Sequence, residues 1–263
     1  MRQPLRLAAR ELEGPKGPPP LLVLHGLFGS QRNWQAHGKA LARERRVFLV
    51  DLRNHGYSPW SDVMDYPAMA ADVAALAERN GLERVSLLGH SMGGKVAMTL
   101  ALDRPALVDR LIVADIAPVA YSHDFDAELD AMRGLDLASV DRRSAADAAM
   151  AAALPNGAVR QFLLQNLDFD DGGKAHWRLN LAVLQSAIDT LTGWPGQDPT
   201  RRFDGPALAV RGEHSPYVDE AGRAALRRLF PGVEMVTIPA VGHWLHVEAP
   251  RPFLGAVQRF LDS

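Results

Sequence analysis

The stretch that decides the fold is VSLLGHSMGGKVAM, residues 85–98. An apolar run leads into a Gly-x-Ser-x-Gly motif at residues 89–93, and a helical pattern follows at once. In that context the serine lies on a strained strand-to-helix turn, and the glycines avoid clashes that a Cβ atom would make. The turn exposes the Ser91 hydroxyl and directs the Met92 N–H, at the helix start, toward a developing negative charge. Ser91 is therefore a candidate nucleophile and Met92 a candidate oxyanion donor.

Short apolar runs recur on both sides of this motif and alternate with helical patterns. The predicted strands are residues 21–26, 47–52, 85–91, 110–116, 207–212 and 233–239. Several are apolar on both faces, as in a parallel sheet that helices cover on two sides. The alternation predicts an α/β fold with a doubly wound, mostly parallel sheet.

The alternation is interrupted after Asp115 and resumes at the predicted strand 207–212. Residues 117–203 between them carry mainly helical patterns. We predict a core made of residues 1–116 and 204–263, with residues 117–203 inserted as a mainly helical cap. Because ligands bind at the carboxyl ends of the strands in open α/β sheets, this cap is expected to cover the site.

Composition limits the classes of function. The chain has 263 residues, of which 47% are hydrophobic and 23% charged, as in an ordinary globular protein. Its net charge of -2 gives no basic excess, so nucleic acid is not an expected partner. The absence of cysteine excludes disulfides and thiolate chemistry. The N-terminus lacks the apolar run of a secretory signal, and no stretch has the roughly 20 apolar residues of a membrane span, so we expect a cytoplasmic protein. Composition does not indicate the oligomeric state.

A second oxyanion donor and a base are found away from the motif. In HGLFGS, after the first central strand, the Leu27 N–H is the natural donor, and Phe28 is expected near the pocket mouth. His243, in VGHWLHVEAP, follows the last strand and matches the usual chain order of nucleophile, acid and histidine. Trp244 beside it is a candidate substrate contact. His246 has helical spacing from His243 and is expected to brace the last helix.

These motifs together carry a resemblance to a known family. The chain resembles the α/β-hydrolase superfamily and, more narrowly, the YbfF-like esterases. The stretches that carry the resemblance are HGLFGSQRNW (25–34), DLRNHGYSP (51–59), GHSMGGKVAM (89–98), VADIAPV (113–119) and GHWLHVEAP (242–250). The resemblance implies ester hydrolysis without a cofactor or metal, on short acyl esters and, as a further class, acyl thioesters.

The resemblance also bears on the acid of a catalytic triad. Many α/β-hydrolases carry it after the strand that ends here at Gly212, where this chain has Ser215. In YbfF-like esterases the acid follows the preceding strand, which points to Asp115. A carboxylate at that strand end needs a partner, and His243 is the best candidate. Three alternatives stay open: Glu213 turns inward, Ser215 shares the imidazole, or Asp115 only ties down loop backbone.

The predicted chemistry is that of a serine hydrolase. Ser91 attacks an acyl carbonyl, His243 takes its proton, and Asp115 orients the imidazole. Water then releases the acid from an acyl-enzyme. Two other readings remain: a C–C bond hydrolase or cofactor-free perhydrolase of the same fold, and a ligand receptor that retains the triad. A cation in the cap that points at a substrate carboxylate would favour the C–C bond hydrolase.

Overall fold

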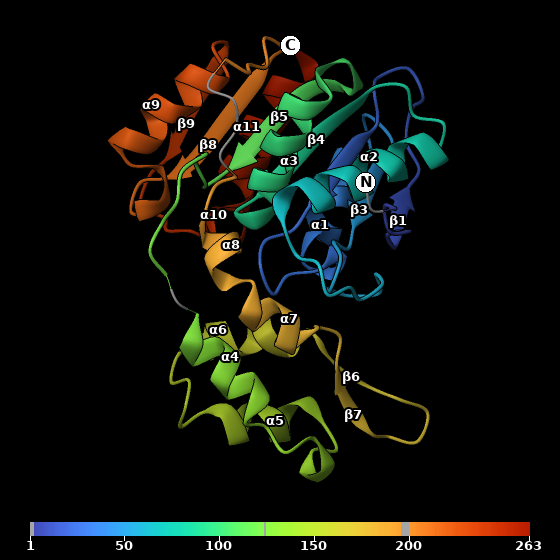
Figure 1. Ribbon diagram of the computed structural model, residues 1–263, viewed down its shortest axis with the longest axis vertical. Coiled ribbons are helices and arrows are strands. Elements are labelled where there is room, and N and C mark those ends of the chain that lie inside the picture. Colours follow the sequence, from blue (N-terminus) through green and yellow to red (C-terminus); the bar gives the residue numbers. More distant parts are fainter. Residues whose placement is uncertain (1–2, 124, 196–199) are drawn as a thin grey trace.

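A seven-stranded sheet forms the centre of the computed structural model, which describes residues 3–123, 125–195 and 200–263 (Figure 1). The strand order is β1-β3-β2-β4-β5-β8-β9. The bounds are β1 (Ala9–Leu12), β2 (Leu21–Leu24), β3 (Val47–Val50), β4 (Val85–His90), β5 (Val108–Ala114), β8 (Ala207–Gly212) and β9 (Val233–Ile238). All neighbours pair in parallel except β1, which is antiparallel to β3. The doubly wound, mostly parallel sheet predicted from the sequence is confirmed.

The edge strand β1 was not expected. Three of its four residues are exposed, so it lacks the apolar signal by which the six inner strands were recognised. Its register, with Ala9 opposite Val50, comes only from pairing with β3.

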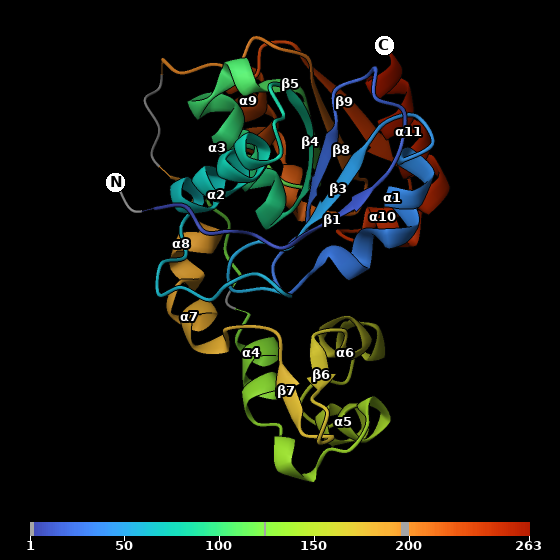
Figure 2. The ribbon, with the colours of Figure 1, turned by 90° about the vertical axis from the view of Figure 1, so that its right-hand side faces the viewer.

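Helices cover both faces of the sheet (Figure 2). One face carries α2 (Tyr66–Arg79), α3 (Met92–Asp103) and α9 (Glu220–Leu229), and the other carries α1 (Gln35–Leu41) and α11 (Pro250–Asp262). Shorter elements join them: η1 (Gln31–Trp34), η2 (Pro105–Leu107), η4 (Pro216–Val218) and α10 (Leu245–Glu248). Alternate side chains of each strand enter opposite cores. In β2, for example, Leu22 packs on the α2 and α3 side and Val23 on the α1 and α11 side.

The segment between β5 and β8 extends from one end of the sheet (Figures 1 and 2). It holds α4 (Asp126–Arg133), η3 (Leu137–Ser139), α5 (Arg143–Met150), α6 (Gly157–Leu164), β6 (Leu167–Phe169), β7 (Ala175–Trp177), α7 (Leu181–Ser186) and α8 (Ile188–Thr192). It is mainly helical, with one short antiparallel pair, β6 and β7. Strands of three residues are too short to show a period of two in the sequence. Residues 124 and 196–199 of the predicted cap, like residues 1–2 at the N-terminus, lie outside the described part.

A buried lysine fastens the end of this inserted segment to the core. Lys95, on α3, donates from Nζ to the carbonyls of Thr192 and Gly193, at 3.0 and 2.5 Å. Its Nζ also lies 4.5 Å from the centre of the Tyr121 ring, close enough for a cation–π contact. Burial lowers the pKa of Lys95 to about 7, because the charged form loses its hydration.

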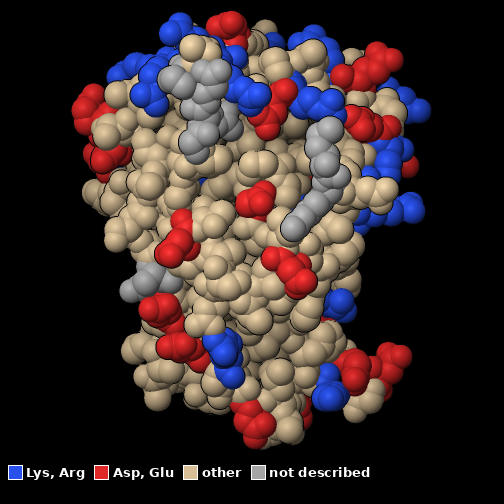
Figure 3. Space-filling model, viewed as in Figure 1, with Lys and Arg blue, Asp and Glu red and all other residues tan. Residues whose placement is uncertain are grey.

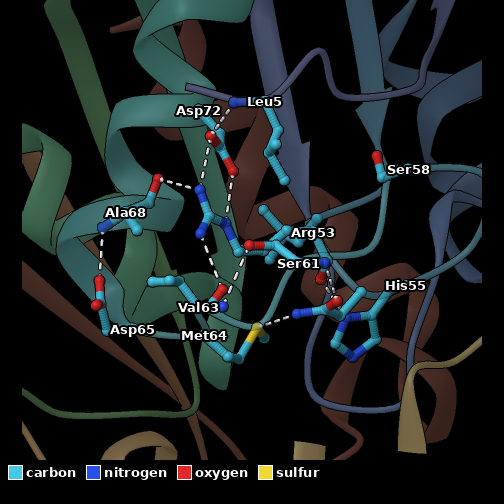
Figure 4. A network of polar contacts seen from close by, with 12 residues as sticks. Leu5, Arg53, His55, Ser58, Ser61, Val63, Met64, Asp65, Ala68 and Asp72 are labelled. Carbon is cyan, nitrogen blue, oxygen red and sulfur yellow. Dashed lines mark hydrogen bonds and ion pairs between the residues drawn. The ribbon is translucent and has the colours of Figure 1, made fainter. Parts of the chain in front are cut away.

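A buried ion pair fixes the loop after β3 (Figure 4). Arg53 donates from Nε and Nη2 to the two carboxylate oxygens of Asp72, at 2.7 and 2.9 Å. The same guanidinium donates to the Val63 carbonyl, and Asp72 also accepts from the Leu5 N–H. A buried pair whose remaining donors and acceptors are satisfied holds its elements in one geometry. The loop that carries His55 is thus anchored to α2 (Figure 4).

The charges seen in Figure 3 are of both signs. Lys and Arg gather over the upper part of this face and its right-hand edge, interleaved with Asp and Glu, while the middle is mostly uncharged. None of the helices in the described residues combines the length and apolarity needed to cross a membrane.

Candidate active site

The Gly-x-Ser-x-Gly turn, residues 89–93, connects β4 to α3 and is here called the elbow. Ser91 has φ 51° and ψ -120°, a conformation that costs free energy for a residue with a Cβ atom. The neighbouring glycines are required, since a Cβ on Gly89 would lie 2.2 Å from the Gly93 carbonyl oxygen. One on Gly93 would lie 2.4 Å from the carbonyl oxygen of Leu24. The Ser91 N–H donates to the Ala114 carbonyl at 3.0 Å, which ties the elbow to β5.

Asp115 and His243 meet directly. Asp115 follows β5 with φ 53° and is fully buried, and its Oδ2 lies 2.7 Å from His243 Nδ1. A carboxylate can only accept there, so Nδ1 carries the proton and Nε2 keeps a lone pair, as a general base requires. The Gly212 N–H donates to Asp115 Oδ1 at 2.8 Å, and the Ser215 hydroxyl donates to Oδ2.

The alternatives left open by the sequence are therefore placed. Ser215 bonds the carboxylate of Asp115, and no bond from it to the imidazole of His243 occurs in the described residues. Glu213 is exposed, and its Oε2 accepts from the Ala240 N–H at 2.8 Å. Asp115 does hold loop backbone, through Gly212, but it contacts His243 as well.

The loop after β2, residues 25–30, is here called the β2 loop. His25 Nδ1 donates to the Gly26 carbonyl at 2.8 Å, and its Nε2 accepts from the Leu52 N–H at 3.0 Å, so His25 braces the loop. Only the neutral imidazole can donate from one ring nitrogen and accept at the other, and burial lowers the pKa of His25 to about 4. Among the described residues, the N–H groups of Leu27 and Met92 donate to no other group, which leaves both free for an oxyanion.

One cavity of about 610 Å³ joins these parts. Ser91, His243, Leu27, Phe28 and Trp244 all line it, whereas Ser215 lies behind Asp115 and does not. The inserted segment forms much of the remaining wall, with His123, Phe125, Glu128, Ala158, Val159, Gln161, Phe162, Leu163 and Gln165. The rings of Phe162 and Trp244 lie 5.4 Å apart, so segment and core touch across the cavity.

His90, the variable residue of the motif next to Ser91, contacts the main chain of His243. Its Nε2 lies 3.0 Å from the His243 carbonyl oxygen and must carry a proton to donate there. Burial, together with neighbouring His246 and His243, lowers the pKa of His90 well below its usual value, so it stays neutral. The contact was not expected from the sequence, although the place of His90 inside the motif was the available signal.

His246 is buried among aromatic side chains, which include Phe253 of the last helix, α11. Its ring stacks on Trp34 with centroids 4.6 Å apart and an interplanar angle of 8°. Burial, with His37 and His243 nearby, lowers its pKa to about 3. Trp34 also lines the cavity, although it is only 1% exposed.

Few charged side chains around the site could bind a metal ion or an acidic substrate. In the described ranges, no group of three or more His, Asp or Glu residues is placed to hold a metal ion. Arg32 is the single Arg or Lys among the described lining residues, and it comes from the core. It donates to the Tyr57 hydroxyl at 2.6 Å and lies 3.5 Å from Asp168, so its charge is already engaged.

Comparison with known proteins places the chain in a family. The family model described as the alpha/beta hydrolase fold matches residues 19–250, and the chain belongs to that family. It is 35% identical to the esterase YbfF of Escherichia coli (strain K12), over 98% of this chain and 99% of that protein. It is 40% identical to the sn-1-specific diacylglycerol lipase ABHD11 of Mus musculus, over 98% of this chain and 86% of that protein.

A solved structure agrees with this assignment. A marine microorganism esterase, 33% identical, superposes with a TM-score of 0.92 and covers 97% of this chain and 99% of its own. The resemblance to YbfF-like esterases is confirmed, and the chain is an enzyme of the carboxylesterase type.

Proposed function

We propose that the chain hydrolyses carboxylic esters through an acyl-enzyme intermediate. Ser91 attacks the acyl carbonyl while His243 removes its proton, and Asp115 orients and stabilises the resulting imidazolium. The observation that carries the proposal is the buried carboxylate of Asp115, 2.7 Å from His243 Nδ1, with His243 and Ser91 lining one cavity. Water activated by the same imidazole then releases the acid.

The oxyanion of each tetrahedral intermediate is held by two main-chain donors, Leu27 N–H and Met92 N–H. The Met92 N–H stands at the first turn of α3, where the helix dipole adds to the stabilisation of negative charge. Neither donor has to break an existing hydrogen bond to serve, which favours the charged state of the intermediate over the neutral substrate.

The proposed substrate is a neutral acyl ester of short chain length, with acyl thioesters as a further class. Phe28 and Trp244 supply apolar contacts for the acyl group, and residues 117–203 act as the cap that completes the wall. C–C bond hydrolysis of an acidic substrate is less well supported, because the one lining arginine in the described part is engaged by Asp168 and Tyr57.

The test is a panel of p-nitrophenyl esters of increasing chain length and of acyl-CoA thioesters, run on wild type and Ser91→Ala. Loss of a serine nucleophile costs on the order of 10⁶ in kcat in a serine protease, and we expect a loss of that order. Ser86→Ala is the matched control, since its buried hydroxyl on β4 has no hydrogen-bond partner among the described residues, and it should stay within about twofold of wild type. Activity of Ser91→Ala within tenfold of wild type would reject the mechanism.

A further inference from the structure

The β2 loop contains a residue in an unfavourable backbone conformation. Phe28 has φ 59°, in the left-handed region that residues other than glycine rarely adopt. It occupies a turn closed by the hydrogen bond from the Gly29 N–H to the Gly26 carbonyl, at 2.9 Å. A residue keeps such a conformation only where its surroundings over-determine it. The contacts of the Phe28 main chain therefore decide the shape of the turn that presents Leu27.

Two buried side chains hold the Phe28 main chain, one on each of its peptide groups. The Phe28 N–H donates to His55 Nε2 at 3.3 Å, from the loop after β3. The Phe28 carbonyl accepts from Asn166 Nδ2 at 2.7 Å, from the connection between α6 and β6. His55 is 0% exposed and Asn166 3%, so water does not compete for either bond. One support belongs to the core and the other to the inserted segment.

The polarity of both contacts is fixed by their other partners. Asn166 Nδ2 also donates to the Leu163 carbonyl at 3.2 Å, and only the amide nitrogen can serve two carbonyl oxygens. His55 Nδ1 donates to the Arg53 carbonyl at 2.9 Å, which leaves Nε2 as the acceptor for Phe28. The Arg53–Asp72 pair anchors the loop after β3, which carries His55 (Figure 4). Neither side chain can satisfy its partners in a flipped orientation.

We propose that Asn166 is a positioning residue that couples the seating of the inserted segment to the oxyanion donor Leu27, by holding the Phe28 carbonyl in place. The Leu27 N–H and the Gly26 oxygen belong to one peptide group, and core groups alone, His25 and the Gly29 N–H, donate to that oxygen. His55 holds the next peptide group, at the Phe28 N–H, and Asn166 holds the one after it, at the Phe28 carbonyl. When the inserted segment moves away, the strained turn loses one of its supports and the Leu27 N–H loses its direction. This inference rests on the proposed ester hydrolysis and on Leu27 as a donor.

A purely structural role for Asn166 makes a different prediction. Asn166 also pairs its main chain with Leu163 and Arg178, so its loss could only loosen the inserted segment. Asn180 provides the comparison, because it too joins that segment to the core, with Nδ2 3.1 Å from Asn54 Oδ1. Its partner lies outside the β2 loop. A structural role would make both variants lose stability without a selective loss of kcat.

The experiment compares Asn166→Ala with Asn180→Ala in the full chain, on a p-nitrophenyl ester. We expect Asn166→Ala to lower kcat between about tenfold and a hundredfold with KM within about twofold, below the 10² to 10³ reported for complete loss of one oxyanion donor. Affinity for a boronic acid, whose tetrahedral adduct places an oxygen at the oxyanion position, should fall by the same factor. Asn180→Ala should keep kcat and boronate affinity within about twofold.

Three outcomes would overturn the proposal: kcat of folded Asn166→Ala within twofold of wild type, equal losses in both variants, or an unchanged boronate affinity. Should Asn166→Ala fail to fold, Asn166→Ser replaces it, because its hydroxyl can still serve the Leu163 carbonyl within the same turn while being one atom shorter toward Phe28. The same criteria then apply. Failure of the proposed function is a separate result, seen as activity of Ser91→Ala within tenfold of wild type.

Discussion

Two strand ends supply the proposed oxyanion donors, and they are built in different ways. The elbow after β4 lies in one short stretch, in which Gly89 packs against Gly93 and α3 begins at Met92. Its close contacts with β2 and β5 are to main-chain carbonyl groups, those of Leu24 and Ala114. The β2 loop depends on side chains far away in the sequence, His55 and Asn166, the latter 138 residues from Phe28. A turn built within one short stretch can be recognised from its motif. A loop held by side chains from distant parts of the chain can change conformation when those parts move.

The two strand ends that could carry the acid also differ in what they contact. Asp115 stands at the end of β5, beside the elbow, and makes the direct contact with the imidazole. Ser215, from the end of β8, reaches only the carboxylate. Ser215 stands where many α/β-hydrolases carry the acid, and here it donates to Asp115 instead. A hydroxyl suits this role because a buried carboxylate needs its lone pairs satisfied.

The largest effect on activity is expected from a substitution that distorts the elbow. In Gly93→Ala, the new Cβ would lie 2.4 and 2.5 Å from the carbonyl oxygens of Leu24 and His25, at the end of β2. The clash displaces Ser91 and both oxyanion donors together, so kcat should fall by at least about 10³. Steady-state kinetics and circular dichroism measure the change. Gly17→Ala is the control, because no heavy atom of the described residues lies within 4 Å of the Cβ that it would gain. Normal kinetics in Gly93→Ala would contradict the expected clash with Leu24 and His25.

Lowering the pH is expected to destabilise the folded protein through two buried histidines that brace the site loops, His25 and His55. His25 and His55 have pKa values lowered to about 4 and about 3 by burial, against about 6.5 in an unfolded chain. As pH falls below 6.5 the unfolded chain therefore binds protons first, so the free energy of unfolding decreases from pH 6.5 toward pH 4. Each histidine contributes a slope of up to about 1.4 kcal/mol per pH unit.

Urea unfolding at pH 7, 6 and 5 measures this slope. His55→Gln removes one titrating group and should make the dependence shallower by up to one proton, even though its stability at pH 7 is lower. A wild-type free energy of unfolding that is constant between pH 7 and 5 would show that these histidines are not held neutral in the folded state.

The smallest effect is expected at Ser215. Ser215→Ala removes one donor from Asp115, while the Gly212 N–H and His243 remain. A hydrogen bond to a charged group is worth about 1.5 kcal/mol at the low end of its range, which applies here because two other donors remain, so kcat should fall about tenfold. Thermal unfolding of the same variant separates this loss from reduced stability. A loss above 10³ would mean that Ser215 acts on His243 itself.

Much of the fold could be predicted from the sequence because its signals are local. Runs such as LLVLHG and VSLLGHS are apolar on both faces, and the inner strands they form are the ones found. The edge strand β1 and the short pair β6 and β7 could not be predicted, since exposed or three-residue strands gain their stability from pairing with a neighbour.

The sequence by itself indicated the elbow, because an apolar strand, the Gly-x-Ser-x-Gly spacing and a helix follow one another in one short stretch. Glycine is needed at positions 89 and 93, since a Cβ atom there would clash with main chain. It also brought His243 forward by its place after the last predicted strand, and the resemblance to YbfF-like esterases pointed to Asp115. Only the tertiary structure decided that Asp115 reaches Nδ1 of His243, that Ser215 donates to Asp115, and that Asn166 holds Phe28. These choices depend on side-chain distances of about 3 Å between segments far apart in the chain, and hydrogen bonds weaken too steeply with geometry for residue type and order to fix them.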